Sequence, residues 1–162
     1  MANFRPTATV QDIMRLMIDP ASDAVWDAVV TTVTLDGVDI TAPRTNEDWA
    51  LLRQNAITLV EATNLLLIDG RRIARAGARS ELPGIDLEPE EIEALVAEDR
   101  STWNELVQGL HDTGLVVLDA VDARDVDALL AAGASLDAAC ESCHSRFWYP
   151  GYGDLPVDAP RR

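Results

Sequence analysis

The sequence predicts an all-α protein, an up-down-up-down bundle of four helices that forms a single domain over residues 1–162. Apolar residues recur at helical spacing through almost the whole chain, and no segment alternates apolar and polar residues as a half-buried strand would. A chain of 162 residues, 48% of them hydrophobic, is long enough to bury the core of one compact domain and too short for two.

The first helix is predicted to start with Thr9 as its N-cap and to extend to Val29. Pro20 lies inside it. Because the proline nitrogen cannot donate a hydrogen bond to the carbonyl of Leu16, we expect a kink or a break there. Residues 34–44, which contain Asp-Gly and Ala-Pro pairs, are predicted to connect this helix to the next.

The second helix is predicted from Thr45, which forms a capping-box pattern with Asp48, to Leu67. An Asp-Gly pair follows and ends it. Residues 71–87 are rich in Gly, Arg and Pro and are expected to be irregular, with a short helical turn at their start.

The third helix is predicted to run from Glu88 to Val121, with Pro89 at its first position. Gly109 and Gly114 weaken this helix locally, and their expected use is to let a bulky group approach closely.

The fourth helix begins at Asp122 or at Arg124-Asp125 and continues to a pair of cysteines. Residues 151–162 are rich in Gly, Pro and Asp and are expected to form a loose tail.

The net charge of −15 limits the kinds of partner that the chain is expected to bind. All 13 basic residues are Arg, and an acidic surface repels nucleic-acid phosphates and anionic membranes. A docking protein would present a basic patch, unless the charge serves only to keep the chain soluble. No apolar run reaches the roughly 18 residues of a membrane span. The first residues show no signal peptide, which we expect to have been removed.

The most informative motif is Cys140-Glu141-Ser142-Cys143-His144, the C-x-x-C-H pattern of covalent haem attachment. Positions i, i+3 and i+4 share one face of a helix. Two thiols one turn apart can therefore add to the two haem vinyl groups as thioethers, and the imidazole of His144 is carried to the iron. The motif predicts one haem c.

Two other interpretations of the cysteines are less favourable. A C-x-x-C redox disulfide normally opens a helix in a βαβ fold, whereas this pair closes a helix in an all-α chain. Structural zinc requires a second pair of Cys or His ligands, which the sequence does not supply.

A haem motif near the C-terminus of a four-helix bundle resembles the class II cytochromes c, the cytochrome c′ and cytochrome c556 family. The resemblance is specific at the motif and at Phe147, three residues after the histidine. It implies a periplasmic monohaem protein, often a homodimer, with His144 as the proximal ligand. The family's Arg-x-x-x-Met-Lys pattern in the first helix is absent.

A distal iron ligand would come from the first helix, because helices one and four are antiparallel neighbours in such a bundle. Met14 and Met17 lie at the matching level, and a thioether there would give His/Met ligation. Met14 is preferred because Met17 lies in the turn that Pro20 disturbs. Methionine on an apolar helical face is also common core filling.

Other residues carry weaker signals. His111, the second histidine, is expected to face solvent or to be hydrogen-bonded. Three groups of residues could surround a haem. Trp26, Trp103 and Trp148 could line its pocket, and the small residues 131–134 would let the flat macrocycle lie against the helix backbone. Arg5 and Arg15 could pair with the haem propionates.

Three functions follow from these residues. One-electron transfer, without enzymatic activity, requires a six-coordinate iron and is the preferred hypothesis. Binding of nitric oxide or carbon monoxide at an open distal site is the alternative. Peroxidase chemistry ranks lowest, because only His111 and a few arginines could provide distal acid–base and charge-stabilising groups.

Overall fold

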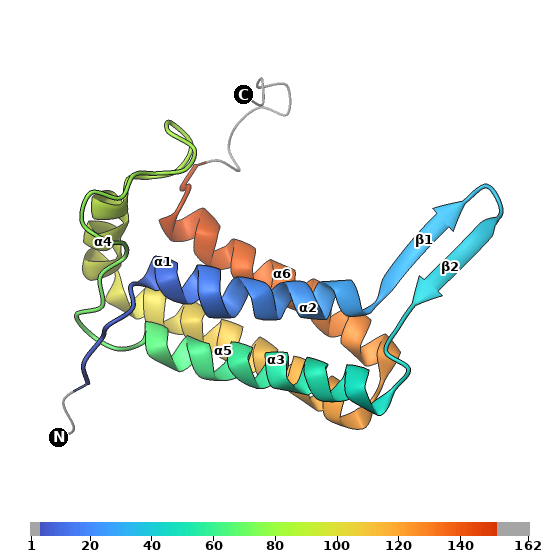
Figure 1. Cartoon of the computed structure of the whole chain (residues 1–162). Coiled ribbons are helices and arrows are strands. Elements are labelled where there is room, and N and C mark those ends of the chain that lie inside the picture. The colour runs from blue at the N-terminus through green and yellow to red at the C-terminus, as the bar shows by residue number, and fades with distance from the viewer. Residues whose placement is uncertain (1–3, 152–162) are drawn as a thin grey trace.

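The computed structural model describes residues 4–151 of the chain. The prediction of an all-α protein is confirmed in part, because the described residues are mostly helical but also form one two-stranded sheet (Figure 1). In chain order the elements are α1 (Val10–Ile13), η1 (Met14–Ile18), α2 (Asp19–Ala28), β1 (Val30–Thr34), β2 (Gly37–Thr41), α3 (Asn46–Leu66), α4 (Pro89–Glu98), α5 (Arg100–Ala123) and α6 (Val126–Phe147). Helix α3 packs against α5, α5 against α6, and α2 against both α3 and α6.

The first helix begins as predicted, because Thr9 caps it and forms a capping box with Asp12. The chain does not leave the helical path at Pro20. Instead η1 forms a π-helical turn just before the proline, in which the backbone N–H of Asp19 donates to the carbonyl of Met14. A π-helical turn inserts one extra residue, and such turns are often found at functional sites.

Residues 30–41 differ from the prediction, since they form an antiparallel β-hairpin instead of part of a connection. The physical reason is local, because β1 consists only of Val and Thr, whose branched side chains favour extended backbone. Gly37, with a φ of 140°, follows the two-residue turn. The hairpin projects away from the helices in Figure 1.

The single third helix that we predicted is two helices, α4 and α5, which meet at Asp99. The side chain of Asp99 accepts a hydrogen bond from the backbone N–H of Thr102, so the residue acts as an N-cap within a predicted helix. The other boundaries agree closely with the sequence. Thr45 and Asp48 form the expected capping box, Pro89 occupies the first turn of α4, and Asp125 caps α6.

The segment between α3 and α4 has no helical turn at its start, but it is held to the rest of the chain. The backbone N–H groups of Val10 and Gln11 donate to the carbonyls of Arg72 and Ile73, each over 2.9 Å. At the segment's other end, the N–H of Leu87 donates to the carbonyl of Trp148 over 2.8 Å. The irregular segment therefore joins the start of the first helix to the end of α6.

Most of the core lies between the long helices. Phe147, Leu59, Leu136 and Ile13 are among its largest fully buried side chains. Gly114 of α5 lies where a Cβ atom would come within 3.0 Å of a methyl group of Val60 on α3. The bulky group that approaches this glycine is thus the neighbouring helix. The expected loose tail lies almost wholly outside the described residues.

Candidate functional site

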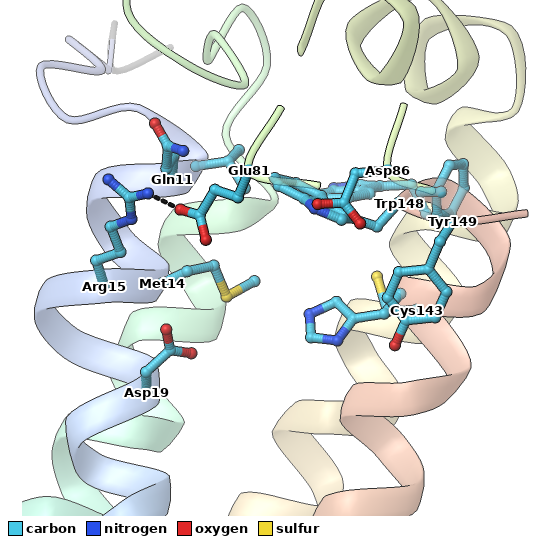
Figure 2. A pocket seen from close by; sticks show the side chains of 13 residues that line it. Gln11, Met14, Arg15, Asp19, Glu81, Asp86, Cys143, Trp148 and Tyr149 are labelled. Carbon is cyan, nitrogen blue, oxygen red and sulfur yellow. Dashed lines mark hydrogen bonds and ion pairs between the residues drawn. The ribbon is translucent and has the colours of Figure 1, made fainter. Parts of the chain in front are cut away.

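A cavity of about 290 Å³ lies between the first helix and the end of α6 (Figure 2). The first helix contributes five lining residues around the π-helical turn, and the last turn of α6 and the residues after it contribute five. The irregular segment and α5 complete the walls. The cavity is lined by Val10, Gln11, Met14, Arg15, Asp19, Glu81, Asp86, Trp103, Cys143, His144, Phe147, Trp148 and Tyr149.

Two residues of the C-x-x-C-H motif, Cys143 and His144, line this cavity. Helix α6 ends three residues after His144, at Phe147, and two backbone hydrogen bonds close this end. The backbone N–H groups of Trp148 and Tyr149 both donate to the carbonyl of His144, over 2.7 and 3.0 Å. The centre of the His144 ring lies 6.4 Å from that of Trp148 and 6.0 Å from that of Tyr149. The imidazole therefore sits in an aromatic environment at the cavity wall.

Of the two methionines considered from the sequence, Met14 lines the cavity. It is the first residue of the π-helical turn, and its thioether extends from the first helix toward the α6 side of the cavity (Figure 2). Met17 is half-buried against the core and is not among the lining residues. The structure thus brings Met14, and not Met17, into the same cavity as Cys143 and His144.

Aromatic side chains form the floor of the cavity. The rings of Trp103 and Phe147 meet edge to face, with 5.5 Å between their centres and an angle of 73° between their planes. The indole N–H of Trp103 donates to the carbonyl of Leu66 over 3.1 Å. Both residues are almost completely buried, so this floor is apolar and closely packed.

The mouth of the cavity is polar and mainly acidic. Arg15 pairs with Glu81 of the irregular segment, and Asp19 and Asp86 lie nearby (Figure 2). Although Asp19 is an exposed residue, desolvation of its carboxyl group raises its pKa, and the electrostatic effect of His144 opposes this shift. Arg15 is the cation available to an anionic ligand group at the mouth, and it is already paired with the carboxylate of Glu81.

Both cysteines are free thiols with raised pKa values. Burial, helped by the charge of Asp137, raises the pKa of Cys140 to about 11, and burial raises that of Cys143 to about 12. Cys140 lies one turn before Cys143 on α6, half-buried, and is not among the residues that line the cavity. Neither thiol has the lowered pKa of a reactive redox cysteine.

Several other predicted residues lie elsewhere. His111 is hydrogen-bonded through Nδ1 to the hydroxyl of Thr63, at 2.8 Å, so the expectation of a hydrogen-bonded side chain is confirmed. Trp26 donates its indole N–H to the carbonyl of Gly133 over 3.0 Å. Trp26 and Gly133 line a separate hollow between α2 and α6. The prediction was therefore wrong for Trp26 and for all of residues 131–134, none of which borders the cavity.

Arg5 is exposed and does not line the cavity, whereas Arg15 does. Glu81, Asp86 and Tyr149 are among the lining residues that were not predicted from the sequence. The first two come from the irregular segment, where no periodicity indicates which side chain points inward. The third directly follows the aromatic residues of the motif region, so its position there was the available signal.

Within residues 4–151, no three or more His, Cys, Asp and Glu side chains gather in a way that could hold a metal ion on their own. Over the same range, no helix combines the length and the apolar character that crossing a membrane requires. Comparisons of the chain with protein-family models, with curated proteins and with solved structures found no match in any of the three.

Proposed function

We propose that this chain is a monohaem c-type cytochrome, built as a four-helix bundle, whose function is one-electron transfer. One observation carries the proposal. Cys143 and His144 of the C-x-x-C-H motif line an aromatic-floored cavity, and Met14 lines the same cavity from the first helix.

The residues present fit a covalently held haem. Cys140 and Cys143 provide two thiols one helical turn apart, His144 provides an imidazole at the cavity wall, and Met14 provides a thioether on the other side. His144 and Met14 would hold the iron through imidazole and thioether groups, a ligand set common in electron-carrying cytochromes, and the group would supply an iron that accepts and releases one electron.

The surrounding side chains support such a group in recognisable ways. Trp103 and Phe147, both almost completely buried, provide an apolar wall against which a flat macrocycle could pack. The two hydrogen bonds to the carbonyl of His144 fix the backbone that carries the imidazole. Preorganisation of this kind limits the structural change that accompanies a change in charge, which suits rapid electron transfer.

The position of Met14 supports the electron-transfer hypothesis over the gas-binding one. A gas-binding haem needs a distal position that is open or weakly occupied. In this chain the thioether of Met14, a soft sulfur group that can bind iron, lines the cavity that would contain that position. An open site would leave Met14 as core filling, which remains the alternative outcome of the test below.

The charge and the motif suggest the cellular setting. With a net charge of −15, the protein would dock most readily with a redox partner that presents a basic patch. Glu81, Asp86 and Asp19 would place part of that negative charge at the cavity mouth. Attachment through C-x-x-C-H takes place outside the bacterial cytoplasm, so we propose a periplasmic location by resemblance to the class II cytochromes c.

The test uses protein matured in a host that exports it and attaches haem. Mass spectrometry should show one porphyrin bound covalently, and the ferric spectrum should be low-spin with a methionine-to-iron band. The Met14→Ala variant should become high-spin and bind carbon monoxide, while Met17→Ala, the matched control, should retain the wild-type spectrum. A high-spin wild type that binds carbon monoxide would instead support the gas-binding alternative. Absence of covalently bound porphyrin would contradict the proposal as a whole.

A further inference from the structure

The β-hairpin at residues 30–41 has one apolar face that the described chain leaves uncovered. The register pairs Thr31 with Ile40 and Val33 with Val38, so these four side chains lie on the same face. Val33, Val38 and Ile40 are 75%, 65% and 53% exposed. The opposite face carries the pairs Val30 with Thr41, Thr32 with Asp39 and Thr34 with Gly37, so Val30 is its one large apolar residue and the face is mainly polar.

A two-stranded hairpin with an uncovered apolar face is unusual in a protein surrounded by water. An isolated two-stranded hairpin is only marginally stable in water, and contiguous exposed apolar patches commonly mark interaction sites. All ten strand residues are exposed, and Leu35 at the turn is fully so. The hairpin projects from the helices, which makes its apolar face accessible to another molecule (Figure 1).

The charge distribution narrows the choice of partner. The chain carries a net charge of −15, yet β1 has no charged residue and the apolar face has none. A basic protein would be drawn to the acidic surfaces instead of this face. An anionic membrane would be repelled by the whole molecule, and residues 30–41 contain no Arg to hold a phosphate.

We propose that the apolar face of this hairpin binds the same face of a second copy of the chain. Two identical uncharged faces are self-complementary, as a two-fold interface requires. Because the hairpin projects, the two faces can stack while the acidic helices stay apart, which limits their mutual repulsion.

The area predicts a weak dimer. The four side chains of the face and Leu35 offer on the order of 300 Å² per copy, compared with the ~800 Å² that each partner contributes to a standard interface. We therefore expect a dimer that dissociates in the micromolar to millimolar range. Its stability should rise with salt, because salt screens repulsion between the acidic bodies and does not weaken apolar contacts.

The experiment is sedimentation equilibrium of the full chain over this concentration range, at ~0.01 M and ~0.5 M NaCl, where the screening length falls from ~30 Å to below ~10 Å. The dissociation constant should fall at least ~10-fold at the higher salt, about 1.4 kcal/mol of binding free energy. A monomer at all concentrations, or a dimer that salt weakens, would overturn the proposal.

Matched variants locate the interface. Val33→Asp and Thr34→Asp each add one carboxylate to β1, at neighbouring residues on opposite faces. The first should weaken association at least ~10-fold and the second less than ~3-fold. The double variant Val33→Thr/Val38→Thr keeps branched side chains that favour the hairpin and should also weaken association. Equal effects of the two Asp variants, or wild-type association of the double variant, would contradict the assignment. The readout does not depend on haem.

Discussion

The environment of the two cysteines separates them from catalytic thiols. They lie near the C-terminal end of α6, where the helix dipole disfavours a negative charge, and both are half-buried. Burial is the main reason that their pKa values rise to about 11 and about 12. A thiol that stays protonated at neutral pH is a poor nucleophile and a poor redox centre. These features are unlike those of cysteines that exchange disulfides.

The raised pKa values predict an alkaline sensitivity of the haem-free chain. The folded thiols retain protons that the unfolded thiols release, so their contribution to stability is complete below pH 9.0 and is lost as the pH rises through about 11 to about 12. Thermal unfolding of haem-free protein between pH 8 and pH ~11 should show a fall in Tm that exceeds the fall in the Cys140→Ser/Cys143→Ser variant. Identical falls in both proteins would contradict this account.

Haem attachment should remove that sensitivity, because a thioether sulfur carries no titratable proton. The haem-loaded protein should therefore lose less stability on going from pH 8 to pH ~11 than the haem-free protein does. The same measurement thus distinguishes the thiol state from the thioether state without any assay of electron transfer.

The sequence predicted the residues on the two helices that border the cavity but not the acidic residues at its mouth. Cys143 and His144 were identifiable because fixed spacing on a helix determines which side chains share a face. Met14 followed from the predicted adjacency of the first and last helices, and Phe147 from the family resemblance. Glu81 and Asp86 were not, since they reach the cavity through an irregular segment whose path depends on contacts with distant residues. The preference for Met14 over Met17 rested on Pro20, and Met14 does line the cavity, but no periodicity in the sequence reveals the π-helical turn that begins at Met14.

Among the elements, helix boundaries with a capping signal were predictable and those without an obvious one were not. Thr9, Thr45 and Asp125 each precede a run of apolar residues at helical spacing, so their helices start where expected. Asp99 was overlooked because apolar spacing continues on both sides of it. The hairpin was missed because five residues of Val and Thr are too few to establish a period.

Asp99 has two roles that mutation can separate, because it caps α5 and also forms an ion pair with a residue of α6. Its carboxylate caps α5 through Thr102 and pairs with Arg146 of α6, whose Nη2 lies 2.6 Å away. Asn is as good an N-cap as Asp, so Asp99→Asn removes only the ion pair, whereas Asp99→Ala removes both interactions. At pH 7 we expect Tm to fall slightly in the first variant and further in the second.

The pH dependence of this effect has a definite sign. The hydrogen bond from Arg146, together with that from Thr102, lowers the pKa of Asp99 below 3.8. The stability that the ion pair contributes is therefore present above pH 3.8 and is lost as the pH falls below it. The difference in Tm between wild type and Asp99→Asn should shrink by pH ~2.5. A difference that is the same at both pH values would show that the ion pair is not responsible.

Two glycines of α5 provide a matched test of how α3 and α5 pack. At Gly109 an added Cβ would meet no atom within 4 Å, so Gly109→Ala should stabilise the protein by about 0.5–1 kcal/mol through helix propensity. At Gly114 the Cβ would lie 3.0 Å from Val60, so the close approach of the helices should cancel or reverse that gain. Urea unfolding measures both. Equal stabilisation by the two substitutions would mean that the helices separate freely.

On the scale of the whole molecule, the two sites proposed here lie at opposite ends of the first helix. About 16 residues separate Met14 from Val30, roughly 24 Å along a helix axis. Figure 1 shows the hairpin at one end of the helices and the last turns of α6 toward the other. A dimer through the hairpins would therefore leave both cavity mouths free to meet a redox partner. Electron exchange and self-association should be separable by mutation.

That separation leads to a final prediction, in which residues 30–41 are replaced by a flexible Gly/Ser connection of about six residues, a common length between neighbouring helices. Since the strand residues are all exposed and α2 already packs against α3, the helices should keep their arrangement. Circular dichroism should retain the helical signal, Tm should change by only a few degrees, and haem attachment should be unaffected. Sedimentation of the same variant should show only monomer. Loss of cooperative unfolding would mean instead that the hairpin is an integral part of the fold and not an appended interaction surface.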